Sequence, residues 1–224
     1  MDFVYWWGND IISRQEESEM KNIAIMGASG QSKVIAEIAL ENGYDNIVFV
    51  DLNPTIDMLG EYPVADEDTD LDNYIDEKYD FIVGIGDAKI RRKVQEKLLS
   101  KGANVVSLVH PSAVVAYDAT IGQGTVVMAG AVINPGTKIG DGCVINTGST
   151  EDHDNTIGEY VHISVGAHTA GTVAIGDNTW LGIGAVVSNN LSICADCVIG
   201  AGAVVVKNII KVGTYVGVTA NIID

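Results

Sequence analysis

Residues 121–145 read IGQGTVVMAGAVINPGTKIGDGCVI, and an aliphatic residue occupies every sixth position of this stretch. The same spacing continues outward in both directions, from Val115 to Ile199. Thirteen of its fifteen hexad positions are aliphatic, and the two exceptions are Glu151 and Thr169. A period of six fits neither an amphipathic helix nor a strand of alternating polarity, whose periods are about 3.6 and about 2 residues.

Hexapeptide repeats are typical of a β-solenoid, in which three short strands form one triangular coil of about eighteen residues. One aliphatic side chain per hexad points inward and stacks on its equivalents in the neighbouring coils, while Gly, Asn and Asp occupy the corners. Burial of each Val or Ile side chain contributes roughly 1.5–3 kcal/mol, so about five coils make a sizeable core. A β-sandwich is excluded, because period-two alternation does not produce fifteen hexads without an insertion. The sequence therefore predicts an all-β solenoid over residues 110–206.

The composition limits the partners of the chain. Its 224 residues are 47% hydrophobic, which leaves room for the solenoid and one small additional domain. The formal charge is −17 and the pI is about 4.3, which argues against partners as anionic as nucleic acid or a membrane surface. No apolar run is long enough to cross a bilayer. We therefore expect neither nucleic-acid binding nor membrane insertion.

The cysteines are three in number, Cys143, Cys194 and Cys197. An odd number without a secretory signal suggests a reducing compartment, so we expect a cytoplasmic protein. The spacing of Cys194 and Cys197 suits metal or redox chemistry when a second such pair exists, and this chain has none. We interpret all three as structural thiols.

The two ends of the chain fall outside the predicted domains. Residues 1–20 combine an aromatic cluster with an acidic segment, and they lack the basic start and apolar run of a signal peptide. We interpret them as an N-terminal extension, and an arm that docks on a neighbouring subunit is the alternative. The C-terminal tail, residues 207–224, carries Lys207 and Lys211, which either contact phosphates or belong to a cap over the edge of the solenoid.

Residues 21–109 predict a small Rossmann-like α/β domain. A strand at residues 22–26, the turn Gly27–Lys33, a helix that closes at Gly43 and a second strand that ends on Asp51 form a βαβ unit. The turn meets a helix N-terminus, which is a ready anion site, and the later acidic residue suits a ribose or a base edge. Since the turn lacks the G-x-G-x-x-G pattern, a dinucleotide is not implied.

The remainder of this domain is less regular in sequence. Residues 52–79 are acidic, and we expect mainly loops there. Further strands are expected at residues 80–85 and 104–108, with Gly86 and Asp87 at the end of the first. The predicted helix between them, residues 88–99, carries four basic residues: Lys89, Arg91, Arg92 and Lys93. These four either lie on a solvated helix face or contact a phosphate near Gly86.

Three of the four histidines lie within a short part of the solenoid: His153, His162 and His168. His153 is followed by Asp154, and Asp152 and Glu151 are close in sequence. A histidine beside a carboxylate is the usual device for raising the basicity of an imidazole and fixing its tautomer. His153 is therefore the predicted general base.

The two interruptions of the hexad pattern point to the same place. Glu151 opens the hexad that contains His153, and Thr169 opens the hexad that contains Gly171. They are eighteen residues apart, which is one coil, so they stack on the same face of adjacent coils. The interruptions therefore predict a single site.

The whole arrangement resembles the NeuD/PglD-like sugar O- and N-acyltransferases over residues 21–221. The segments that carry the resemblance are Gly27–Lys33, Gly84–Asp87, His110-Pro111, Asn146–Gly158, Val161–Ala167, Ala170-Gly171 and Tyr215–Ala220. It implies a left-handed parallel β-helix, a homotrimer with active sites between subunits, and acetyl-CoA as the acyl donor. We also expect direct transfer of the acetyl group without an acyl-enzyme, because no cysteine or serine is obviously paired with His153, and we expect no metal.

The resemblance also implies roles for individual residues. His153 becomes the base and Asp154 orients it, while His162 and the backbone of Gly171 meet the thioester, where an amide stabilises the oxyanion. The remaining cofactor contacts are Ile183 and Ala201 in the pantetheine groove, with Lys207. The substrate residues are Ser29, Gly30, Gln31, Ser32, Lys33, Asp51, Gly86 and Asp87.

The implied reaction is N-acetylation of a nucleotide-linked 4-amino-4,6-dideoxy sugar, with UDP as the nucleotide, for bacterial surface glycans. The chain departs from its relatives at Gln31, where they often have His, at Leu52, where some have a second Asp, and at Asp154, where Glu also occurs. Three alternatives stay open: a sugar or sialic acid O-acetyltransferase of the same family, a γ-type zinc carbonic anhydrase suggested by the three histidines, and a non-enzymatic trimeric ligand-binding scaffold.

Overall fold

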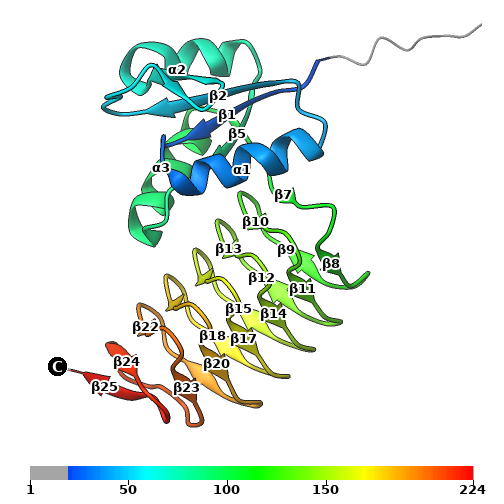
Figure 1. The fold of residues 1–224 in the computed structure, drawn as a ribbon, viewed down its shortest axis with the longest axis vertical. Coiled ribbons are helices and arrows are strands. Elements are labelled where there is room, and N and C mark those ends of the chain that lie inside the picture. Colours follow the sequence, from blue (N-terminus) through cyan, green and yellow to red (C-terminus); the bar gives the residue numbers. More distant parts are fainter. Residues whose placement is uncertain (1–19, 224) are drawn as a thin grey trace, which may run out of the picture.

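The computed structural model describes residues 20–223, so the expected N-terminal extension lies outside the described residues except for Met20. An α/β domain comes first, and the coils of a parallel β-helix descend from it (Figure 1). Its elements are β1 (Asn22–Met26), α1 (Gly30–Glu41), β2 (Asn46–Asp51), β3 (Met58–Leu59), β4 (Tyr62–Asp66), α2 (Glu67–Asp76), β5 (Asp80–Val83), α3 (Ala88–Ser100) and β6 (Asn104–Val105). The predicted fold class, a Rossmann-like domain followed by a left-handed β-helix, is confirmed.

The α/β sheet has the strand order β3-β4-β2-β1-β5-β6, and all neighbours are parallel except β3 and β4. Its strands read as continuous apolar runs because helices cover both faces. Ile35 of α1 packs on one face, and Leu71 of α2 and Leu98 of α3 pack on the other. The order reverses at β1, where a crevice opens at the carboxyl ends of the strands. No helix within residues 20–223 is both long and apolar enough to cross a membrane.

Several sequence predictions for this domain were wrong in detail. Residues 52–79 are not mainly loop, because they form the β3–β4 hairpin and α2. Helix α2 buries only Leu71 and is stabilised by its capping Asp66 and an acidic first turn, so it lacks an apolar stripe. Helix α1 begins at Gly30, so the turn after β1 is shorter than expected. The strand expected to reach Leu108 ends at Val105.

The solenoid consists of three parallel sheets, one on each face of a triangular prism. The first face contains β7 (Leu108–Val109), β10 (Val126–Val127), β13 (Val144–Ile145), β16 (His162–Ile163), β19 (Trp180–Leu181) and β22 (Val198–Ile199). The second contains β8 (Val114–Val115), β11 (Val132–Ile133), β14 (Thr150–Glu151), β17 (His168–Thr169), β20 (Val186–Val187) and β23 (Val204–Val205). The third contains β9 (Thr120–Ile121), β12 (Lys138–Ile139), β15 (Thr156–Ile157), β18 (Ala174–Ile175) and β21 (Ser192–Ile193).

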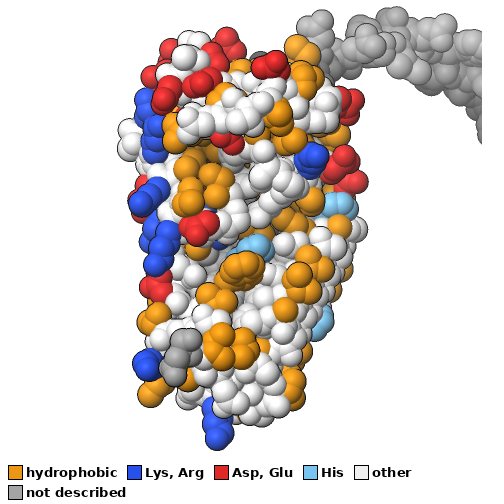
Figure 2. Space-filling model, turned by 60° about the vertical axis from the view of Figure 1, so that its left-hand side comes forward, with side chains coloured by type: hydrophobic (Ala, Val, Ile, Leu, Met, Phe, Trp, Pro, Cys, Tyr) orange, Lys and Arg blue, Asp and Glu red, His pale blue; other side chains and the backbone are white. Residues whose placement is uncertain are grey.

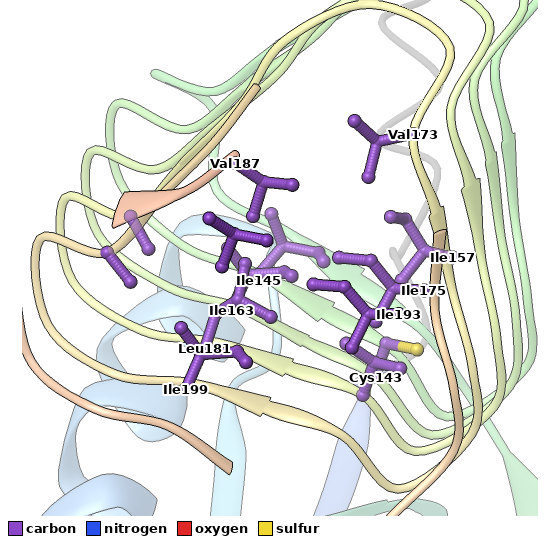
Figure 3. Packing of buried hydrophobic residues seen from close by; sticks show 14 of the residues in the cluster. Cys143, Ile145, Ile157, Ile163, Val173, Ile175, Leu181, Val187, Ile193 and Ile199 are labelled. Atoms are coloured by element: carbon purple, nitrogen blue, oxygen red, sulfur yellow. The ribbon is translucent and has the colours of Figure 1, made fainter. Parts of the chain in front are cut away.

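The hexad residues form ladders inside the prism. Ile145, Ile163 and Leu181 stack along the first face, and Ile157 and Ile175 stack along the third (Figure 3). Neighbouring strands are about 4.8 Å apart, so each side chain lies in contact with its equivalents above and below. The resulting core runs the full length of the solenoid and makes its corners rigid supports for exposed residues.

The C-terminal tail continues the first face. Strand β24 (Thr214–Val216) pairs in parallel with β22, and β25 (Asn221–Ile223) pairs with β24 in the antiparallel direction. This hairpin covers the last edge of that sheet, as the interpretation as a cap requires. Lys207 and Lys211 are exposed in the segment that leads to it.

Candidate active site

The His153 turn joins β14 to β15 at one corner of the solenoid. The imidazole is exposed, and its Nδ1 lies 2.8 Å from Oδ2 of Asp154. The His153 N–H donates to Oδ1 of Asp152, which also accepts from the side-chain amide of Asn134 in the preceding coil. Asp154 by hydrogen bonding and Asp152 by its charge raise the pKa of His153, because each stabilises the imidazolium. With Nδ1 held in this way, Nε2 is the ring nitrogen offered to a ligand.

Gly171 lies over His153 in the following coil. The Thr172 N–H donates to the His153 carbonyl at 2.9 Å, and a Cβ on Gly171 would collide with Nε2 of His153. Only glycine leaves room for the imidazole at this position. Strands β14 and β17 pair with Glu151 opposite Thr169, so the stacking expected from the coil period is present.

The Glu151 side chain points into the core and not toward His153, although the two residues are close in sequence. It is fully buried, and neither carboxyl oxygen has a hydrogen-bond partner within residues 20–223. Burial raises its pKa to about 8, so the group is mainly protonated at neutral pH. In the same coil, buried Asn155 donates to Oγ1 of Thr169 at 2.6 Å. Beneath the His153 turn, Glu151 and Thr169 therefore occupy inward hexad positions that are aliphatic in the other coils.

A pocket of about 590 Å³ lies between the α/β domain and the first face of the solenoid. The α/β side of its lining comes from Gln31, Gly86, Asp87 and Lys89, and the solenoid side includes His162, Asn178, Trp180 and Asp196. Three of the predicted substrate residues therefore meet one predicted cofactor residue here. The turn after β5 and the first residues of α1 and α3 are what bring the α/β residues to the solenoid.

His162 lies in this pocket as a neutral, stacked ring. Its imidazole is 5.8 Å from the Trp180 ring, with an angle of 15° between the planes. The side-chain amide of Asn146 lies 3.2 Å from Nε2. Burial, and then the charge of Arg91, lower the pKa of His162 to about 4, against a hydrogen bond to the Gly86 backbone that favours protonation. His162 can therefore donate or accept one hydrogen bond per nitrogen, but it is a weak base.

A second depression, of about 310 Å³, lies in the crevice at the carboxyl ends of β1 and β2. Gly27, Asp51 and Lys93 are among its lining residues. Asp51 accepts from the backbone N–H of Ala28 at 2.9 Å, so it shapes the turn after β1 as well as lining the crevice. This is the location at which open α/β sheets bind ligands.

The other predicted substrate residues have different surroundings. Ser29 and Ser32 direct their hydroxyls to the Gly84 carbonyl, which ties the start of α1 to the end of β5. Lys33 points away from both cavities and lines a shallow depression with Tyr62. Lys33 is therefore not positioned by this fold to contact a ligand in the crevice.

The cofactor residues lie on other corners of the same chain. Ile183 and Ala201 are exposed and stack at the corner between the first and second faces, one coil apart. His153 and Gly171 occupy the corner between the second and third faces, and neither lines the interdomain pocket. One chain therefore does not unite the proposed base with the pocket that contains His162.

Comparison with known proteins agrees with this division of the chain. Residues 22–98 match the PglD N-terminal domain, and residues 118–150 and 172–207 match the bacterial transferase hexapeptide family of six repeats. The acetyltransferase domain of PglB from Neisseria gonorrhoeae is 37% identical, with a TM-score of 0.87 over 91% of this chain and 100% of that one. The chain belongs to the NeuD/PglD-like sugar acyltransferase family.

Two further relatives of this NeuD/PglD-like chain have informative names. PerB from Caulobacter crescentus, solved in complex with CoA and GDP-perosamine, is 36% identical, with a TM-score of 0.85 over 91% of this chain and 97% of that one. The UDP-N-acetylbacillosamine N-acetyltransferase of Bacillus subtilis (strain 168) is 36% identical over 114 residues, which are 49% of this chain and 52% of that relative. The match thus spans about half the length of the curated relative.

In this NeuD/PglD-like chain, most of the basic residues of α3 contact the solenoid and hold the α/β domain against it. Neither sequence interpretation of these residues foresaw this role. Arg91 is fully buried against the solenoid. Arg92 pairs with Glu159 at 3.3 Å and with Asp177 at 3.5 Å. Lys93 lines the crevice and remains available to a phosphate. Figure 2 shows basic side chains gathered along one edge of the molecule, beside the α/β domain.

The three clustered histidines do not form a metal centre. His153 lies at a corner of the solenoid, and His162 stacks on Trp180 on the first face. His168 lies on the second face, where it forms a hydrogen bond with Thr150. Across residues 20–223, no group of three or more His, Cys, Asp or Glu side chains converges on a common point. The geometry therefore does not favour the zinc hydratase alternative.

Trp180 is one of the lining residues that the sequence interpretation missed. It follows His162 by one coil, is half exposed, and donates from Nε1 to the Ser164 hydroxyl at 2.6 Å. Its signal was available, because a hexad register that points position 181 inward points position 180 outward. Trp180 lines the interdomain pocket, and aromatic side chains are typical of ligand-binding cavities.

Proposed function

We propose that this chain is an acetyl-CoA-dependent N-acetyltransferase that acts on a nucleotide-linked 4-amino-4,6-dideoxy sugar. The observation that carries the proposal is the exposed His153–Asp154 pair, held on a rigid corner beneath Gly171. The names of the relatives support the reaction class, since they include N-acetyltransferases that act on UDP- and GDP-linked amino sugars. The use of acetyl-CoA as acyl donor supports the cytoplasm as the site of action. The acetylated sugar would then be used in bacterial surface glycans.

In the proposed reaction, the nitrogen of the sugar 4-amine attacks the thioester carbonyl carbon, and Nε2 of His153 accepts a proton from that amine. Asp154 holds the proton on Nδ1 and stabilises the imidazolium that forms. The C–N bond forms, the tetrahedral intermediate collapses, the C–S bond breaks, and the proton leaves with the CoA thiol. The Gly171 N–H is available to the oxyanion, because it donates to no group within residues 20–223.

A homotrimer accounts for the separation of His153 from the pocket. The outward side of the second face carries exposed Val114 and Val186, and Tyr117 beside it is 97% exposed. An apolar sheet face of this kind suits burial against another copy of the chain. Packing there would bring the His153 corner of one subunit toward the pocket and the Ile183 corner of its neighbour. Acetyl-CoA would then lie in the groove between the two subunits, with Lys207 near its phosphates.

The two cavities support a nucleotide sugar as the acceptor. The crevice beside Asp51 and Lys93 suits a nucleoside and a phosphate, and the interdomain pocket with Gln31 and Trp180 suits the sugar. In so acidic a chain, the phosphates depend on Lys93 and on backbone N–H groups at the start of α1.

The test is steady-state kinetics with acetyl-CoA and a UDP-linked 4-amino-4,6-dideoxy sugar. We expect His153→Ala to lower kcat/KM by about 10²–10⁴, the usual contribution of a general base. His110→Ala is the matched control, because His110 pairs with Glu41 near the domain junction and lines neither cavity. A His153→Ala enzyme within a few-fold of wild type would remove His153 from the mechanism.

A further inference from the structure

Among residues 20–223, Arg91 is the largest side chain that is completely buried. Its Nε donates to the Gly142 carbonyl at 2.7 Å, and its Nη2 donates to the Tyr160 carbonyl at 2.8 Å. Its Nη1 donates to the carbonyls of Ile85 and Gly86, at 2.9 and 2.7 Å. All four acceptors are backbone carbonyls and none is a carboxylate. A buried charge without a counter-ion is expensive unless its donors are satisfied, so the four bonds must form together.

The position of Arg91 follows from the way α3 lies along the solenoid. One turn of an α-helix rises about 5.4 Å and one coil rises about 4.8 Å, so successive turns of α3 meet successive coils. Gln95, one turn beyond Arg91, donates to the Gln123 carbonyl at 3.0 Å in an earlier coil. At the start of α3, Lys89 pairs with Asp196 at 3.5 Å in a later coil. Arg91 occupies the middle of this contact.

The four bonds of Arg91 connect the two sides of the interdomain pocket. Gly86 belongs to the pocket lining on the α/β side. Tyr160 lies two residues before His162, which belongs to the lining on the solenoid side. A single planar guanidinium therefore sets the distance between Gly86 and the start of β16. Burial, and after it the Arg91 charge, lower the pKa of His162 and keep that ring neutral.

We propose that Arg91 is a positioning residue for the nucleotide-sugar pocket, because it holds the Gly86 loop in register with the coil that carries His162. The proposal rests on the proposed function only for the identity of the ligand. Lysine can supply one charge but cannot reach four carbonyls on two sides at once, so the planar fork is required. A displacement of about 1 Å in a substrate-positioning element can lower a rate by about 10²-fold.

The experiment compares Arg91→Met, Arg91→Lys and the control Gln95→Met in the full-length protein. Gln95 is buried on the same helix face and contacts the solenoid away from the pocket. With a UDP-linked 4-amino-4,6-dideoxy sugar, we expect Arg91→Met to raise the KM for the sugar nucleotide about 10–100-fold, and more than it raises the KM for acetyl-CoA, because the Gly86 loop lies on the sugar-nucleotide side of the pocket. We expect Arg91→Lys to be intermediate and Gln95→Met to stay near wild type.

Hydrogen exchange provides a readout that does not depend on activity. Backbone amides of residues 84–90 should exchange faster in Arg91→Met than in wild type, and Gln95→Met should leave them unchanged. If Arg91→Met does not fold, the Arg91→Lys variant carries both comparisons. Equal rises in both KM values, or wild-type KM and exchange in the Arg91 variants, would overturn the positioning role. If the wild-type protein acetylated neither the UDP sugar nor GDP-perosamine, the proposed function would be rejected instead. The hydrogen-exchange comparison would still decide the role of Arg91.

Discussion

We expect Glu151 to make the solenoid less stable as the pH rises, and this effect can be measured directly. The carboxyl group lies inside the core, where burial raises its pKa from 4.5 to about 8. In the unfolded chain the same group is solvated and ionises near its ordinary value. The folded state therefore holds a proton that the unfolded state releases. Replacement by Gln keeps the size and polarity of the side chain but removes the titration.

The sign and size follow from proton linkage. Below about pH 4.5 the Glu151 carboxyl group is protonated in both the folded and the unfolded state, so its ionisation does not lower the free energy of unfolding. As the pH rises toward 8, the unfolded state gains by ionising, so the free energy of unfolding falls; above about pH 8 both states are ionised and the loss levels off. Each pH unit within this window is worth about 1.4 kcal/mol, which amounts to about 3 kcal/mol at pH 7 relative to acid. Glu151→Gln should therefore be about 3 kcal/mol more stable than wild type at pH 7.

The assay is urea denaturation of wild type and Glu151→Gln at pH 5, 6, 7 and 8, at one protein concentration because the proposed homotrimer would unfold in a concentration-dependent way. The difference between the two proteins should widen from about 1 kcal/mol at pH 5 to about 3 kcal/mol at pH 7. Glu96→Gln, on the exposed side of α3, serves as the control and should track wild type at every pH. Parallel curves for wild type and Glu151→Gln would show that the carboxyl group is not buried as described.

Three further predictions concern the candidate site. Asp154→Asn should shift the acidic limb of the pH profile of kcat/KM to lower pH, because Asp154 raises the pKa of His153; an unshifted limb would assign that limb to another group. Gly171→Ala should lower kcat at least about 10²-fold without unfolding the protein, since its Cβ occupies the position of the His153 ring, and normal turnover would contradict the geometry. The His162 ring should stay neutral between pH 5 and 8 in side-chain NMR spectra, because its pKa is lowered to about 4; protonation near pH 6.5 would contradict its burial.

Local and periodic features were predictable from the sequence. The six-residue period determines the solenoid and its inward residues, because each coil repeats the same contacts with its neighbours. His153 and Asp154 are adjacent in the chain, and Gly171 is one coil further on from His153, so their meeting follows from the period alone. The same register, applied strictly, also predicts that Glu151 points inward.

Features that depend on the docking of one domain against the other appeared only in the tertiary structure. Arg91 bonds to Gly142 and Tyr160, which are 51 and 69 residues away, and nothing in the local pattern of a basic helix distinguishes it from Arg92 or Lys93. The interdomain pocket likewise exists only because α1 and α3 bring residues far apart in sequence to the first face.

The physical reason is that periodicity specifies contacts within a repeating stack, where the partner of each residue is known in advance. Docking between two different surfaces has no period, so its contacts are set by shape and by which buried donors find acceptors. The hexad pattern therefore determined the scaffold and the His153 corner. The tertiary structure alone decided where that scaffold meets the α/β domain, and with it the cavity available to a ligand.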